Sequence, residues 1–161
     1  LLYLSGSKTH LKDYTIISGC LIKLAMEYPD DFCINFMGTL NDQTSIFSNL
    51  GVETNFIPFV SFEEMIHEIG RNDLVLVPLE NTVFNNAKSN IKFVEAASQG
   101  VPVIASEVDE YKSAINSGVN GWLCQNEHQW YESLKDIILN KEKLEKAGIK
   151  AYETALRSFS V

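Results

Sequence analysis

Two lysines and a carboxylate stand around the start of a predicted helix in the stretch FNNAKSNIKFVE, residues 84 to 95. The dipole at the start of a helix favours anions and penalises cations, so Lys88 and Lys92 oppose the local field. At 100° per residue Lys88 and Glu95 are nearly in line, and Lys92 lies on the same side of the helix. An anionic ligand at this helix end would explain the two cations.

The chemistry that this stripe predicts is the binding of a diphosphate. Backbone N–H groups at a helix start and the Lys88 ammonium group both favour phosphate oxygens. Lys8 and His10, in the polar stretch of residues 5 to 14, would hold the same anion from a second loop. Glu95, one to two turns deeper, is suited to accept hydrogen bonds from sugar hydroxyl groups.

A simpler interpretation fits the same residues, and their spacing leaves both open. Lys88, Lys92 and Glu95 also suit a solvated helix face with i,i+3 ion pairing worth about 0.3 kcal/mol. The SGS at residues 5 to 7 suits an ordinary turn between strand and helix, because the chain has neither GxGxxG nor GxxxxGK[ST]. His67 and His128 fit helix surfaces, and no HExxH or GxSxG motif accompanies them.

Composition limits the classes of protein to which the chain can belong. Its 161 residues suit one domain, and 45% hydrophobic with 21% charged residues suits a packed core. The net charge of -8 argues against binding to nucleic acid or to an anionic membrane surface. The three cysteines, Cys20, Cys33 and Cys124, form no CxxC or zinc-ligand spacing, which indicates reduced thiols in a reducing compartment. No run suits a signal peptide or a membrane span.

Alternating apolar patterns predict the elements that position these residues. Short apolar runs predict buried strands at residues 1–5, 32–38, 55–60, 74–79, 101–106 and 121–124. Amphipathic helices are predicted between them, one from Ile17, Leu21 and Leu24, another from the apolar face of Ile91, Val94 and Ala97. SFEE, residues 61 to 64, predicts a capping box at a third helix, and helical patterns follow at 130–139 and 141–156.

Repeated strand, helix, strand order predicts an α/β fold, a three-layer, Rossmann-like, doubly wound parallel sheet of about six strands. Right-handed crossovers favour the strand order 3-2-1-4-5-6. That order places the loop at residues 5–14 beside the loop at residues 79–92, at the switch point where ligands of such sheets bind. Both loops are polar and carry lysine, so the sequence predicts an anion site between them.

One segment resembles a known family. KSNIKFVEAASQGVPVIAS, residues 88 to 106, with Tyr111, Ile115 and GVNGWL at 118–123, resembles the C-terminal, donor-binding half of retaining GT-B glycosyltransferases of family 4, the group 1 glycosyl transferases. YLSGSKTHLKDY at 3–14, MGTL at 37–40 and Trp130 fit the same pattern. The resemblance covers nearly the whole chain and implies one half of a GT-B fold.

The resemblance implies a role for Glu95 and shows one position, Ala87, at which this sequence departs from the family's motif. Glu95 matches the second acid of the family's E-x7-E motif, which binds the ribose hydroxyl groups of the nucleotide. Ala87 stands where the first acid would contact the donor sugar, and Glu80 or Asn86 would have to substitute for it. The departure is similar to a subset of the family with the pattern FN-x-x-KS-x-[IL]-K, matched here by Phe84, Asn85, Lys88, Ser89, Ile91 and Lys92.

The remaining site residues are carried over by position. The resemblance implies that Gly6, Ser7 and Lys8 meet the phosphates, and that Val60 and Ser61 lie near the base. Lys88, Ser89 and Asn90 replace the family's Gly-rich turn beside the diphosphate and sugar, with Lys92 also contacting substrate. Lys88 and Glu95 are the expected catalytic residues.

Fixed cations and a helix dipole would stabilise the leaving nucleoside diphosphate, with no metal and no cofactor beyond the nucleotide-sugar substrate. The absence of a DxD pair agrees with this.

These observations predict residues 1–161 to be the donor-binding domain of a hexosyltransferase-like retaining glycosyltransferase in glycan, lipopolysaccharide or capsule synthesis. The chain begins within a predicted strand and without Met, so the acceptor domain is expected in a missing N-terminal part, and the isolated domain is expected to be inactive. Expected partners are that domain, the nucleotide-sugar donor and an acceptor glycan or lipid, in the cytoplasm or at the inner membrane face. Alternatives are a nucleotide-sugar epimerase or a phosphorylase of the same fold, and a non-catalytic interaction module, which Ala87 favours.

Overall fold

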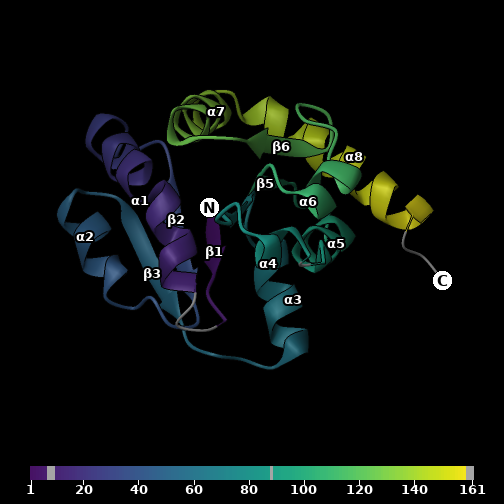
Figure 1. Ribbon diagram of the computed structural model, residues 1–161. Coiled ribbons are helices and arrows are strands. Elements are labelled where there is room, and N and C mark those ends of the chain that lie inside the picture. The colour runs from purple at the N-terminus through teal and green to yellow at the C-terminus, as the bar shows by residue number, and fades with distance from the viewer. Residues whose placement is uncertain (7–9, 88, 159–161) are drawn as a thin grey trace.

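The computed structural model describes residues 1–6, 10–87 and 89–158, and these form a parallel sheet covered by helices on both faces (Figure 1). The strands pair in the order β3-β2-β1-β4-β5-β6, so the predicted order is confirmed. Their bounds are β1 Leu2–Leu4, β2 Cys33–Met37, β3 Glu53–Ile57, β4 Val75–Val77, β5 Val103–Ser106 and β6 Gly121–Cys124. β1 lies between β2 and β4, with Leu2 paired to both Asn35 and Val75.

One face of the sheet is covered by α1 His10–Glu27, α2 Gln43–Asn49 and α7 Glu127–Leu139. The predicted stripe of Ile17, Leu21 and Leu24 is fully buried there, in one core cluster with Trp130 and Leu134. Because both faces of the sheet are covered, its inner strands consist almost entirely of apolar residues. That continuity explains why their positions could be predicted from short apolar runs.

The other face is covered by α3 Phe62–Gly70, α5 Ile91–Ser98, α6 Asp109–Ala114 and α8 Lys141–Ser158. The predicted capping box is confirmed at the start of α3, where Ser61 and Glu64 exchange side-chain to backbone hydrogen bonds. α8 packs on α5 through small buried residues, among them Ala97, Ala151 and Ala155. None of the helices in the described part of the chain combines the length and apolar character needed to cross a bilayer.

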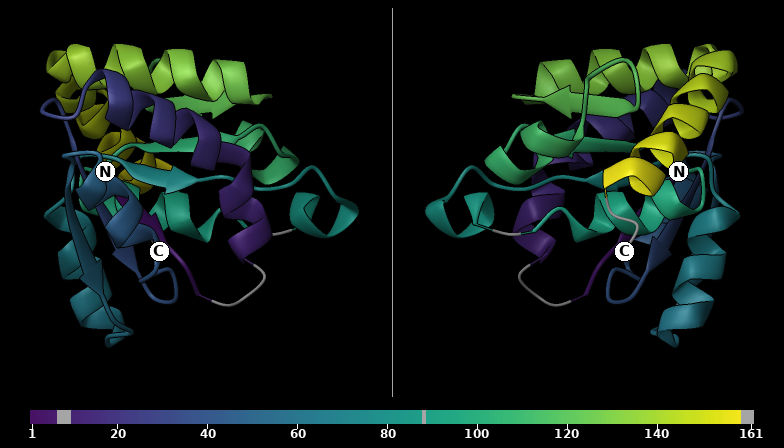
Figure 2. Two further views of the ribbon diagram at one scale, coloured as in Figure 1. Left: turned by 90° about the vertical axis from the view of Figure 1, so that its left-hand side faces the viewer. Right: turned by 90° about the vertical axis from the view of Figure 1, so that its right-hand side faces the viewer.

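The segment after β4 differs from the prediction of one helix beginning near residue 88. A short helix, α4 Val83–Asn86, ends at its C-cap Ala87, and α5 begins only after Asn90. α4 projects from the molecule beside the start of α1 (Figure 2). The predicted helix start near residue 88 is therefore wrong, because the helix that carries Lys92 and Glu95 begins at Ile91. The predicted alignment of Lys88 with Glu95 falls on a residue outside the described part of the chain.

The buried face of α5 also differs from the predicted one. Phe93, Ala96 and Ala97 are buried, whereas Ile91 is 54% exposed and Val94 is only partly buried. Residues at steps of three drift around a helix of 3.6 residues per turn, so the pattern of Ile91, Val94 and Ala97 did not fix the facing direction. The rotation of α5 matters for the site, because it turns Lys92 and Glu95 toward the end of β1.

Candidate functional site

A cavity of about 170 Å³ opens at the carboxyl ends of β1, β2 and β3, between α3 and α5. In open α/β sheets, ligands bind at this edge. Most of its wall is apolar, and the charged side chains among the described residues that line it come from α5. The lining residues are Leu4, Ser5, Gly6, Met37, Gly38, Phe59, Val60, Met65, Lys92 and Glu95.

Lys92 connects α5 to the central strand of the sheet. Its ammonium nitrogen Nζ donates a hydrogen bond to the main-chain oxygen of Leu4, the last residue of β1, at 3.1 Å. The side chain is only partly exposed. The Lys92 ammonium group therefore lies at the end of β1, where the loop that contains Gly6 begins.

Glu95 lies one helical turn beyond Lys92 and is half-buried in the same cavity. Burial raises the pKa of the Glu95 carboxyl group, because desolvation disfavours its charged form, and the nearby Lys92 charge acts in the opposite direction. On the adjacent α6, burial raises the pKa of Tyr111 above its usual range, and Glu95 adds to that shift. Among the described residues that line the cavity, Glu95 thus supplies a half-buried carboxyl group that can accept hydrogen bonds.

The floor of the cavity is a row of strand ends held together by main-chain contacts. The Ser5 N–H donates to the Met37 carbonyl at 2.8 Å, and the Gly38 N–H donates to the Ile57 carbonyl at 2.9 Å. The hydroxyl groups of Ser5 and Thr39 also form a short hydrogen bond. Gly38 has a φ of 108°, which favours glycine, and lies against the backbone of Ser5. These contacts fix the spacing of the loops after β1, β2 and β3.

A buried polar contact joins the start of α1 to the loop after β4. The Asp13 carboxylate accepts hydrogen bonds from the Glu80 N–H at 3.0 Å and from the Asn85 side-chain amide at 3.4 Å. The same amide donates to the Glu80 carbonyl at 2.8 Å, and the Thr82 hydroxyl caps the Asn85 N–H. Asn85, the second residue of the FN-x-x-KS pattern, therefore has a structural role that its sequence position did not reveal.

Replacing Asn85 with alanine is expected to destabilise the chain by about 1 to 3 kcal/mol, because the buried Asp13 carboxylate and the Glu80 carbonyl would each lose a donor. Urea unfolding followed by circular dichroism measures this. The adjacent Asn86 is a matched control, since its amide bonds Asn81 at the surface, and Asn86→Ala should cost about 0.5 kcal/mol or less. Equal losses in the two variants would contradict the structural role of the Asp13 contact.

The structure brings together four of the predicted site residues and places others elsewhere. Gly6, Val60, Lys92 and Glu95 line the cavity. Ser61 instead caps α3, and its hydroxyl group bonds Glu64. The Asn90 amide donates to the Glu110 carbonyl at the start of α6, and Ser89 is exposed. Ser7, Lys8, Lys88 and the side chain of His10 lie outside the described residues. The substrate roles of all these residues stay predictions.

Two substitutes were suggested for the missing acid at Ala87, and neither lines the cavity of Glu95. The Asn86 amide bonds Asn81, and Glu80 lines a wider cavity of about 710 Å³ at the carboxyl ends of β4, β5 and β6. Among the described residues no group of His, Cys, Asp or Glu is placed to hold a metal ion. A metal-independent site stays a prediction.

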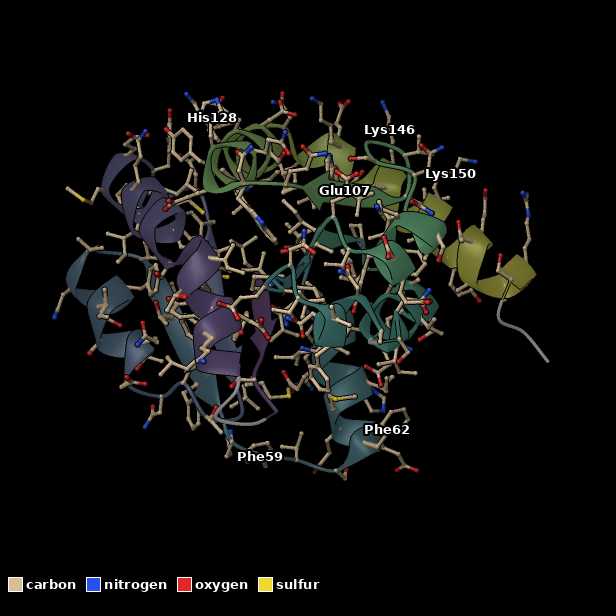
Figure 3. All side chains as sticks on the ribbon, in the orientation of Figure 1. Phe59, Phe62, Glu107, His128, Lys146 and Lys150 are labelled. Carbon is tan, nitrogen blue, oxygen red and sulfur yellow. The ribbon has the colours of Figure 1, made fainter. Side chains whose placement is uncertain are left out.

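The apolar wall of the cavity was not predicted from the sequence. Met37, Phe59 and Met65 contribute to it, and Phe59 is 64% exposed in the loop that leads into α3 (Figure 3). Such residues look like ordinary core residues in a sequence. The signal that was available is the position of Met37 and Phe59 near the carboxyl ends of predicted strands, at the edge where ligands bind.

Comparison with known proteins identifies the family. The model of the family "Glycosyl transferases group 1" matches residues 44–154. D-inositol 3-phosphate glycosyltransferase of Nocardia farcinica is 25% identical over 108 residues, which are 65% of this chain and 23% of that protein. The chain therefore spans about a quarter of the length of that relative.

Two solved structures share the fold at low sequence identity. HepE of Anabaena, solved with UDP and glucose, superposes with a TM-score of 0.72 at 18% identity, covering 99% of this chain and 44% of HepE. The C-terminal domain of the group 1 glycosyl transferase LpcC of Francisella tularensis gives the same score and identity, and 86% of it is covered. These likenesses confirm the predicted Rossmann-like fold of a GT-B half. Because the family model matches more than half of the residues of this chain, the chain belongs to the group 1 glycosyl transferases.

Proposed function

We propose that the chain is the donor-binding half of a retaining glycosyltransferase that moves a sugar from a nucleoside diphosphate sugar to an acceptor. The observation that supports this most is the cavity that contains Glu95, an under-hydrated carboxylate at the ligand-binding edge of a doubly wound sheet. The position of Glu95 in the family pattern agrees with a role in donor binding. HepE, which has a similar fold, was solved with UDP-glucose. The acceptor site would belong to a second domain outside this chain.

The cavity suits the nucleoside part of such a donor. Ligand sites are mostly apolar, with a few polar groups that fix orientation. Here Met37, Phe59 and Met65 would contact the base, while Glu95 would accept hydrogen bonds from the ribose hydroxyl groups. Val60 also lines the cavity, and its main-chain groups would read the edge of the base.

The diphosphate would lie between the start of α5 and the loop after β1. Main-chain N–H groups at the start of a helix attract phosphate, and Lys8 and Lys88 would add charge from the two loops. These groups would stabilise the leaving diphosphate as the bond to the sugar breaks, which is catalysis by fixed electrostatics. We propose a hexosyl donor and an acceptor used in glycan, lipopolysaccharide or capsule synthesis, with the acceptor half providing any contact with the membrane.

An NMR titration of the 15N-labelled chain with UDP, GDP and ADP, and then with their sugar conjugates, tests the proposal. Binding is expected to shift the amide signals of Gly6, Gly38 and Phe59 and those at the start of α5. Inorganic pyrophosphate is the control, because it should shift signals near α5 and leave those of Phe59 unchanged. The proposal fails if no nucleotide shifts the cavity signals. A longer form of the protein with a labelled donor then tests transfer.

A further inference from the structure

The contact of Lys92 with β1 fixes where its ammonium group lies. Its ammonium group donates to the Leu4 main-chain oxygen at 3.1 Å, so it lies at the end of the central strand. In the chain, Lys92 precedes Glu95 by three residues, and both side chains line one cavity. A helix places residues three apart on the same face, so the cation and the carboxylate are neighbours.

The charges around Glu95 make Lys92 its main electrostatic partner. Burial favours the neutral form of Glu95, and Lys92 favours the charged form. On the α3 side the cavity is lined by uncharged groups, those of Phe59, Val60 and Met65. α6 contributes Tyr111, which burial keeps protonated, and α8 packs on α5 through alanines. Among the described residues that line the cavity, Lys92 is the one cation.

We propose that Lys92 is a positioning residue for Glu95, which ties α5 to the end of β1 and keeps the Glu95 carboxylate ionised for hydrogen bonds to the donor. The inference rests on the proposed function in one respect, that Glu95 binds the donor. It replaces the sequence-based expectation that Lys92 itself contacts the substrate. A lysine held by a main-chain oxygen has its position fixed before the ligand arrives, which is what orientation of a neighbouring carboxylate requires.

Substitution of Lys92 by glutamine removes the charge and keeps a hydrogen-bond donor for Leu4. Without the cation, the pKa of Glu95 should rise further, because an opposite charge at short range normally lowers a carboxyl pKa by about 1 to 3 units. Nucleotide affinity of K92Q should then fall more than that of the wild type when the pH is lowered from about 8 to about 5, because the ionised fraction of a carboxyl group falls about tenfold for each pH unit below its pKa. Calorimetric titration with the nucleotide that binds best measures this.

Further variants separate the effect of charge from that of packing. Lys92→Arg keeps the cation and should restore the pH profile of the wild type. Glu95→Gln removes the titrating group, so adding K92Q to it should produce no further pH dependence. Lys92→Met provides a second neutral side chain if K92Q does not fold. If K92Q lost affinity by one factor at every pH, and if salt reduced that loss, Lys92 would contact phosphate directly and the inference would be overturned.

The carboxyl titration of Glu95 can also be followed by NMR without any nucleotide. A higher midpoint in K92Q than in the wild type is expected, and an unchanged midpoint would overturn the inference. This arm does not depend on the ligand. Failure of the wild type to bind any nucleotide would count against the proposed function alone, because the midpoints would still report whether Lys92 keeps Glu95 ionised.

Discussion

Alanine in place of Gly38 is expected to destabilise the fold by more than about 3 kcal/mol, because two penalties coincide at this position. The backbone has a φ of 108°, and a Cβ would stand 1.8 Å from the Ser5 carbonyl oxygen. Ser5 cannot withdraw easily, since its N–H is bonded to Met37. For a domain of this size the loss corresponds to a fall in Tm of roughly 10 °C, which thermal unfolding by circular dichroism measures.

Gly118 provides the matched control for Gly38. Its φ is 81°, yet a Cβ there would meet no atom within 4 Å. Gly118→Ala should therefore incur the backbone penalty alone, roughly 1 to 2 kcal/mol. The difference between the two variants measures the close approach of β2 to the end of β1. Similar losses in both would mean that Ser5 moves aside, and that the floor of the cavity is less rigid than its hydrogen bonds indicate.

Replacing Glu95 with alanine should weaken binding of the nucleotide sugar by roughly 100-fold, about 2.7 kcal/mol, if the carboxylate binds the donor as proposed. Charge-assisted hydrogen bonds in a poorly hydrated cavity are the strongest contacts that this site offers. Calorimetric titration measures the loss. Glu132→Ala, which removes an exposed acid from α7, should leave the affinity unchanged. An affinity of E95A equal to that of the wild type would remove Glu95 from the site.

Replacing Glu95 is expected to affect the stability of the fold in the opposite direction to its effect on binding. Because burial raises the pKa of Glu95, the folded chain binds this proton more tightly than the unfolded chain does. The stabilisation that comes from protonation is present at low pH and is lost as the pH rises through the raised pKa. Glu95→Gln is therefore expected to keep or raise the Tm near neutral pH, with no advantage below about pH 4. Residues kept for function often carry such a cost.

Much of the fold could be predicted because its signals are local. The buried strands appear as apolar runs, Ile17, Leu21 and Leu24 mark one helix face, and Ser61 with Glu64 marks a helix start. The separation of α4 from α5 could not be predicted in this way. α4 is joined to the start of α1 by Asp13 and Asn85, which meet across 72 residues of chain. The spacing of residues 84 to 95 does not indicate that contact.

The place of some site residues could also be predicted, because the strand order follows from local patterns. The strand order brought the ends of β1 and β4 together, so Glu95 and Lys92 were expected near Gly6. The position of the Lys92 ammonium group depends on a hydrogen bond to Leu4, a residue 88 positions earlier. Ser61 and Asn90 were assigned by position in a family pattern, but their side chains contact Glu64 and Glu110. A pattern gives the location of a residue, whereas its contacts depend on the tertiary structure.

The central position of β1 has a consequence for how the chain acquires its fold. β1 precedes both of its neighbours in the chain, with β2 beginning at Cys33 and β4 at Val75. During synthesis one edge of this apolar strand therefore stays unpaired until the segment around Val75 has emerged from the ribosome. Long-range parallel pairing is intrinsically slow and leaves the nascent chain open to aggregation. We expect refolding to be slower than for a helical domain of equal size, and newly made chains to depend on chaperones until β4 has docked.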